Sequence, residues 1–277
     1  MQSIMGSKIL GQAPMETSTQ NTGMGKVLAI ATPIAIGATL IVNSLSNFSP
    51  PGGESIAVLA NSLLKGVQIL PANYAFAIWG LIYLGLIAYG IYQYHPCREG
   101  NAVIQRVNLL LIVACLAQIG WVILFTYQQF WWSVLLMLGI LLPLIGIYLQ
   151  LDVGRARASR QRKWSADIPF SVYLGWISVA TIVNVASALY ISGWIGNESA
   201  TGWTVAMLIV GFVLAAIAAT QRADIAFTLV FIWAYIAIAI RQSANTAVWV
   251  TAIAGAVILA GLLFFATRKR RSLRESV

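Results

Sequence analysis

Eight long apolar segments divide the chain, each bounded by charged residues or by clusters of Gly, Pro and Asn. A helix needs about 17 to 25 mostly apolar residues to cross the hydrocarbon core of a bilayer, and these segments have that length. Their apolar residues run on without the alternation that strands of a membrane barrel would show. We therefore predict an all-α integral membrane protein with about eight transmembrane helices. The predicted spans lie near residues 27–47, 73–94, 104–127, 131–151, 168–192, 203–221, 224–240 and 247–266.

Composition agrees with a membrane protein and narrows the function classes. The chain is 59% hydrophobic and 9% charged with a mean hydropathy of +0.81, whereas soluble domains carry about 25% charged residues. The net charge of +9 resides in loops and tails rather than on a folded basic module, so we expect no nucleic-acid partner. Cys97 and Cys115 are too few for a zinc site or a disulfide framework.

The distribution of basic residues predicts which side of the membrane each loop faces. With eight spans and an inner N-terminus, only Lys65 and Arg241 of the 17 Lys and Arg residues fall on the outer side. A chain with seven or nine spans would place one of the two main basic clusters on the wrong side. We therefore expect both termini in the cytoplasm and anionic lipid at the basic inner face. Residues 1–26 are expected to form a disordered cytoplasmic tail, and 268–277 a basic one.

Three spans each carry aromatic and amide side chains on a single helical face. Because a helix advances about 100° per residue, positions three, four and seven apart share a face. Two interpretations fit such stripes equally well: a packing seam between helices, or an aromatic cavity with a few polar groups that holds a ligand. The stripes contain Phe76, Trp79 and Tyr83 in the second span, Gln118, Trp121 and Phe125 in the third, and Tyr173, Trp176, Ala180 and Asn184 in the fifth.

Ionisable residues lie at the ends of the spans, and no span has a charge at its centre. Proton relays and ion-coupled carriers usually place such a group at membrane depth, so a proton-driven pump is not expected. The sequence shows neither a nucleophile with its base nor a cluster of His, Cys and carboxylates, so we expect no catalytic residues, no metal and no required cofactor. The protein is therefore predicted not to be an enzyme.

The fifth span carries a recognisable motif. The segment PFSVYLGWISVATIVN, residues 169–184, resembles the fifth-helix signature of the TspO/MBR family, the translocator or tryptophan-rich sensory proteins. Val179 and Val183 stand where that family usually has Phe and Leu. The matching residues are Pro169, Tyr173, Trp176, Ala180 and Asn184.

Two further spans are similar to motifs of the same family, in the same order. The third-helix pattern N-x-x-W-x-x-L-F corresponds to Gln118, Trp121, Leu124 and Phe125, with Gln in place of Asn. The second-helix pattern corresponds to Pro71, Trp79 and Tyr83. The loop before it departs from the family pattern, because W-x-P-P is reduced to LPAN, Ala77 replaces a proline, and the usual phenylalanine appears one place later as Phe76.

The resemblance covers residues 27–193 and implies a five-helix bundle with a pocket beneath its first loop. It further implies binding of a porphyrin or haem-type tetrapyrrole, or of a sterol-like molecule, together with a sensory or transport-modulating role. The implied ligand-binding residues are Pro71, Phe76, Trp79, Tyr83, Gln118, Trp121, Phe125, Tyr173, Trp176, Ala180 and Asn184.

Residues 194–267 form three further spans without a counterpart in the usual five-helix member. Small residues recur there every four positions, which is typical of closely packed membrane helices and predicts a scaffold or a homodimer contact. These residues are Gly211, Ala215 and Ala219 in one span and Ala252, Ala256 and Ala260 in another.

Two other functions fit the sequence. A small secondary transporter of a metabolite would explain the eight spans, with Pro33 and Pro143 breaking two helices at corresponding places. A structural subunit would instead use the small-residue faces of the C-terminal spans to bind a partner.

Overall fold

The computed structural model describes residues 16–94, 101–156, 158–194 and 199–275. Helices make up the regular structure of these residues. Seven are long and apolar enough to cross a membrane, and α9 is a shorter apolar helix of 17 residues. The fold is therefore the predicted all-α, multi-pass membrane protein. The helices are α1 Glu16–Phe48, α2 Ile56–Asn61, the 3-10 helix η1 Asn73–Ala77, α3 Ile78–Tyr92, α4 Ala102–Thr126, α5 Phe130–Gln150, α6 Arg160–Arg162, the π-helical turn η3 Lys163–Asp167, α7 Ile168–Ile191, α8 Ala200–Arg222, α9 Ile225–Arg241 and α10 Thr246–Glu275.

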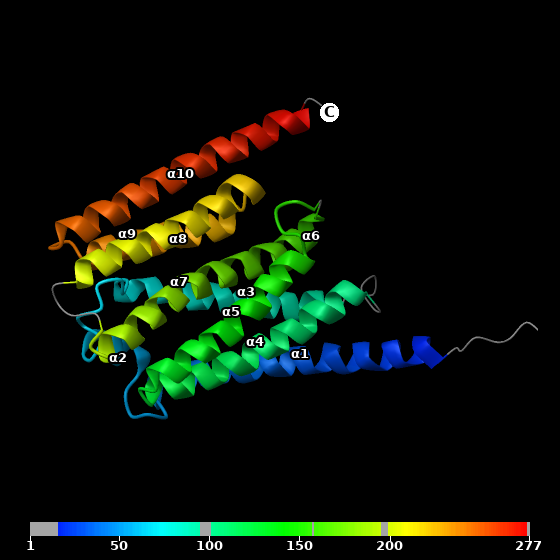
Figure 1. The fold of residues 1–277 in the computed structure, drawn as a ribbon. Helices are drawn as coiled ribbons and strands as arrows, with labels where there is room; N and C mark the ends of the chain where they lie inside the picture. Colours follow the sequence, from blue (N-terminus) through cyan, green and yellow to red (C-terminus); the bar gives the residue numbers. More distant parts are fainter. Residues whose placement is uncertain (1–15, 95–100, 157, 195–198, 276–277) are drawn as a thin grey trace, which may run out of the picture.

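Five helices form a closed ring, and three more form a layer beside it (Figure 1). Around the ring, α1 contacts α4, α4 contacts α5, α5 contacts α7, α7 contacts α3, and α3 returns to α1. The helices α8, α9 and α10 pack on one another, and α9 and α8 dock on α7. Helix α7 therefore lies between the ring and the layer, which explains why it is the most buried of the long helices.

Small residues allow the close packing of the layer. At Gly175 an added Cβ would lie 3.1 Å from the Val230 Cβ, so this glycine lets α7 and α9 approach closely. The small-residue stripes predicted in α8 and α10 are buried inside the protein, apart from the outward-facing Ala260. Their observed role is thus internal packing, and homodimerisation stays a prediction.

The first helix begins earlier than the sequence indicated. Residues 16–26, expected in a disordered tail, are helical in α1, whereas residues 1–15 lie outside the described residues. No proline interrupts the chain between Glu16 and Lys26, so a helix formed in the membrane continues into its polar flank. Helix α10 likewise extends into the basic tail as far as Glu275. Pro33 and Pro143 lie inside α1 and α5, and both helices continue past them.

Charges at the helix ends connect the ring to the layer. Asp224 caps α9 by accepting a hydrogen bond from the Phe227 N–H at 3.1 Å. Its other oxygen accepts from the Tyr148 hydroxyl at 2.8 Å and from the Ser171 hydroxyl at 2.7 Å. Three helices, α5, α7 and α9, are therefore joined at one buried carboxylate.

The long loop between α1 and α3 folds over one end of the ring. We call residues 50–77 the roof segment; it contains α2 and η1. The Ser55 side chain caps α2 by accepting from the Val58 N–H at 3.3 Å. Gly52 allows the segment to touch the end of α4, because an added Cβ would lie 1.9 Å from the Thr126 carbonyl oxygen.

Candidate functional site

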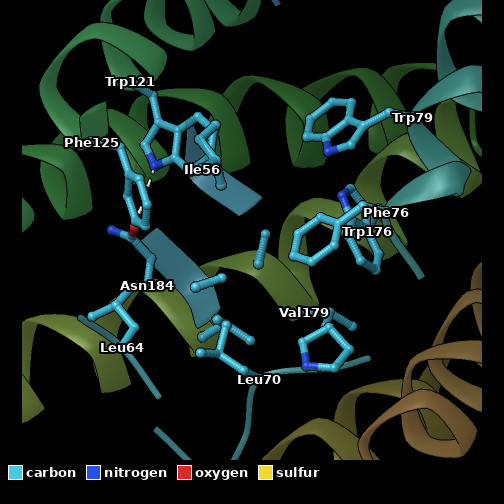
Figure 2. A pocket seen from close by; sticks show the side chains of 14 residues that line it. Ile56, Leu64, Leu70, Phe76, Trp79, Trp121, Phe125, Trp176, Val179 and Asn184 are labelled. Carbon is cyan, nitrogen blue, oxygen red and sulfur yellow. Dashed lines mark hydrogen bonds between the residues drawn. The ribbon is translucent and has the colours of Figure 1, made fainter. Parts of the chain in front are cut away.

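A cavity of about 50 Å³ lies between the roof segment and the helices α3, α4 and α7 (Figure 2). Its wall is almost entirely apolar, and its volume is smaller than the about 300 to 1,000 Å³ of typical small-molecule sites, so a polycyclic ligand needs the cavity to widen. The lining residues are Ile56, Ala60, Leu64, Leu70, Pro71, Phe76, Trp79, Trp121, Phe125, Trp176, Val179, Ala180, Val183 and Asn184.

Most of the predicted ligand-binding residues meet at this cavity. Three do not line it: Gln118 and Tyr173, which bond to each other, and Tyr83, which lines a neighbouring cavity. The structure thus brings the stripes of three spans together around an open space rather than in a closed seam. The predicted residues in the wall are Pro71, Phe76, Trp79, Trp121, Phe125, Trp176, Ala180 and Asn184.

Sequence reasoning missed six lining residues. Val179 and Val183 lie on the same face of α7 as Trp176, Ala180 and Asn184, so helical spacing could have identified them. The other four, Ile56, Ala60, Leu64 and Leu70, belong to the roof segment. Ile56, Ala60 and Leu64 are spaced four positions apart, and this spacing is the only sequence signal that they share a face.

Aromatic rings form two opposed walls of the cavity. Figure 2 shows Phe76, Trp79 and Trp176 on one side and Trp121 and Phe125 on the other. Phe76 meets Trp176 edge to face with centroids 5.9 Å apart, and Trp121 lies 5.2 Å from Phe125. Such walls suit a flat apolar molecule, since aromatic rings attract one another in stacked and edge-on geometries.

Asn184 connects three helices at the edge of the cavity. Its Oδ1 accepts from the Trp121 Nε1–H at 3.3 Å, shown dashed in Figure 2, and its Nδ2 donates to the Ser133 hydroxyl oxygen at 3.0 Å. The Ser133 hydroxyl also donates to the Phe130 carbonyl at 2.7 Å. Asn184 is 2% exposed and turned inward, so its amide bonds to neighbouring helices instead of facing lipid.

Two buried side-chain donors, one on α7 and one on α4, have no hydrogen-bond partner among the residues that the structure describes. They are Nε1 of Trp176 and Nε2 of Gln118, in side chains that are 2% and 1% exposed. The Tyr173 hydroxyl donates to Oε1 of Gln118, so the amide oxygen is engaged while the amide nitrogen is not. An unmet buried donor costs about 1 to 3 kcal/mol, and native proteins retain few of them.

A second cavity, of about 180 Å³, adjoins the first. The two share Ile56, Phe76, Trp79 and Trp121, and Tyr83 lines only the second. Its other wall is polar and comes largely from the C-terminal end of α1. Those polar residues are Asn43, Ser44, Ser46 and Asn47.

A comparison with family models agrees with this architecture. The model described as TSPO-like protein matches residues 29–265. The chain belongs to the TSPO-like family. The match continues through α8, α9 and most of α10, beyond the five spans covered by the motif resemblance. No curated protein and no solved structure matches the chain.

Membership defines the protein coarsely as a membrane protein of TspO type, from a family that is generally non-enzymatic. Within the described residues, no three His, Cys, Asp or Glu side chains gather as metal ligands would. The cavity itself offers apolar, aromatic walls, and one lining residue, Trp176, carries a buried N–H without a partner among the described residues.

Proposed function

We propose that this TSPO-like protein binds an amphipathic small molecule in the cavity beneath the roof segment. The observation that carries the proposal is an apolar, aromatic cavity one of whose lining residues, Trp176, holds a buried Nε1–H without a partner among the described residues. A ligand acceptor would satisfy this donor, and the remaining surface of the ligand would contact the two aromatic walls. The ligand class is thus a flat or polycyclic apolar body carrying a carbonyl or carboxylate oxygen.

Porphyrins and sterol-like molecules both fit this description in part. A porphyrin offers a large aromatic face and carboxylates, whereas a sterol offers an aliphatic ring system with one hydroxyl or ketone. The aromatic walls favour the porphyrin, because stacked rings add about 0.5 to 1.5 kcal/mol per pair to simple burial. Binding would serve a sensory or transport-modulating role, without a catalytic step. Haem-type cofactors are then ligands rather than resident groups.

The positive-inside pattern supports an orientation with both termini in the cytoplasm. The roof segment carries Lys65 and contacts Arg241, the two basic residues assigned to the outer side. The cavity accordingly lies near the outer surface, and anionic lipid would contact the basic inner face.

A thermal-shift panel on the purified full-length chain tests the binding proposal. Protoporphyrin IX, a sterol and an unrelated apolar dye are each added at rising concentration, and the melting temperature is followed. A ligand that binds only the folded state stabilises it by RT ln(1 + [L]/Kd), about 2.7 kcal/mol at 100 times Kd. We expect protoporphyrin IX to raise the melting temperature most.

A cavity-filling variant provides the control. Ala180 lines the cavity, so Ala180→Trp should abolish the protoporphyrin shift. Ala260→Trp places the same side chain on the exposed face of α10 and should leave the shift intact. Equal shifts in the two variants, or no shift with any member of the panel, would overturn the proposal.

A further inference from the structure

The roof segment is hydrogen-bonded to the C-terminal layer rather than to the ring that it covers. The helices α1 and α3 are joined to the roof segment directly by the chain. Within the described residues, every hydrogen bond between the roof segment and any other part of the protein is made with residues 201–245. The roof bears five of the cavity's lining residues before η1, so the element that forms this wall of the cavity is held by α9 and its neighbours.

Arg241, at the end of α9, makes the central contacts. Its Nη2 donates to the Ala60 carbonyl at 2.8 Å, and its Nη1 donates to the Pro71 carbonyl at 3.3 Å. Nη1 also lies 3.2 Å from Oδ1 of Asn61. Ala60 and Pro71 both line the cavity, so one guanidinium fixes two separate points of the cavity wall. Hydrogen bonds from a charged donor are roughly twice as strong as neutral ones.

Two further contacts come from the same face of α9. The Ala72 N–H donates to the Ala237 carbonyl at 3.1 Å, and the Trp233 Nε1–H donates to the Ala75 carbonyl at 3.2 Å. The Trp233 ring also meets Tyr74 edge to face at 5.1 Å. Positions 233, 237 and 241 are four apart, so they form one stripe along α9 that faces the roof.

The beginnings of α8 and α10 add a third attachment. The Thr201 hydroxyl and the Asn245 amide both donate to Oε1 of Gln68, at 3.1 and 3.2 Å. Asn245 also donates to the Thr201 hydroxyl at 2.9 Å. All three C-terminal helices are therefore joined to the roof at the same end of the molecule (Figure 1).

We propose that α9 is a latch for the cavity, formed by Trp233, Ala237 and Arg241, which positions the roof and controls ligand entry. The inference rests on the proposed function for the identity of the cavity as a ligand site. Because the roof forms one wall of a cavity of about 50 Å³, a ligand gains room when the roof lifts. Because the latch makes the bonds that hold the roof, its release sets how often this occurs. Arg241 is a positioning residue that acts on the ligand through Ala60 and Pro71.

Cysteine labelling measures roof opening without any ligand. Ala180→Cys places a thiol in the cavity wall of a full-length chain in which Cys97 and Cys115 are replaced by serine. The rate of reaction with a water-soluble maleimide then follows the population of the open roof. We expect Arg241→Gln to raise this rate about tenfold, as for the loss of one charge-assisted hydrogen bond.

Arg222→Gln is the matched control. Arg222 also donates to a backbone carbonyl, that of Val153 at 2.9 Å, and pairs with Asp152 at 3.3 Å. It lies at the C-terminal end of α8, however, and makes no hydrogen bond to the roof segment among the described residues. Its loss should leave the Ala180→Cys rate unchanged. A second latch variant, Trp233→Phe, removes one donor while keeping a ring beside Tyr74 and should also speed labelling. Trp233→Phe tests the latch in the same way if Arg241→Gln fails to fold.

Native Cys115 separates roof opening from general loosening. It is fully buried on α4 and does not line the cavity, so in a chain that keeps this thiol alone the latch variants should label as slowly as the parent. Faster labelling of Cys115 in Arg241→Gln, or equal Ala180→Cys rates in Arg241→Gln and Arg222→Gln, would overturn the latch. If the latch variants speed labelling while no ligand binds, the proposed function fails and the latch stands.

Discussion

Trp176→Phe should have opposite effects on stability and on binding. Its indole N–H is buried without a partner, so replacement by phenylalanine removes a cost of about 1 to 3 kcal/mol from the folded state. The smaller ring leaves a void that costs of order 1 kcal/mol. The free energy of unfolding should therefore stay within about 1 kcal/mol of the parent value or rise.

Ligand affinity should fall in the same variant. If the indole N–H donates to the ligand, the variant loses one hydrogen bond worth about 0.5 to 1.5 kcal/mol, which raises Kd by up to about tenfold. Unfolding by denaturant in mixed micelles gives the stability, and a titration with protoporphyrin IX gives Kd. The expected combination is unchanged or increased stability together with weaker binding.

Trp249→Phe supplies the comparison, because Trp249 is 42% exposed on α10, outside the cavity. It should change neither quantity. The reasoning is refuted if Trp176→Phe lowers the free energy of unfolding by more than about 2 kcal/mol while Kd stays the same. That result would mean that the indole N–H has a partner within the protein.

Three further changes have definite expected outcomes. Asn184→Leu leaves the buried Trp121 Nε1–H unpaired and removes the bond to Ser133, so it should lower the free energy of unfolding by about 1 to 3 kcal/mol, measured by denaturant titration in micelles; no loss would show that the amide contributes nothing. Gly52→Ala should displace the roof, because its Cβ would lie 1.9 Å from the Thr126 carbonyl oxygen, and faster labelling at the Ala180→Cys site reports this; unchanged labelling counts against it. In intact cells, an impermeant maleimide should label Lys65→Cys at once and Arg155→Cys only after permeabilisation, whereas the reverse order would invert the predicted topology.

The helices were predictable because a bilayer leaves few alternatives for a long apolar segment. The convergence on the cavity was partly predictable as well. Trp176, Ala180 and Asn184 share a face through helical spacing alone, and that face points toward Trp121 in the structure. The sequence could not decide between a seam and a cavity, since the choice depends on how far apart the facing helices stand.

The position of the roof segment over the cavity could not be predicted from the spacing of apolar residues. Leu70 and Pro71 line the cavity because the chain around them is bonded to Arg241 and Ala237, residues about 170 positions away along the sequence. Gln118 shows the converse limit, since it lies on the predicted face and yet its amide oxygen is occupied by the Tyr173 hydroxyl. Spacing gives the direction of a side chain, whereas tertiary contacts determine its partner.

The indole proton resonances of the tryptophans test the central claim most directly. In a chain labelled with ¹⁵N-tryptophan, Trp176→Phe identifies the Trp176 Nε1–H signal. On addition of protoporphyrin IX this signal should move downfield as its proton gains an acceptor, while that of Trp249, outside the cavity, stays in place. A saturating titration that leaves the Trp176 signal unmoved, or that shifts Trp249 equally, would contradict the assignment of this cavity as the ligand site.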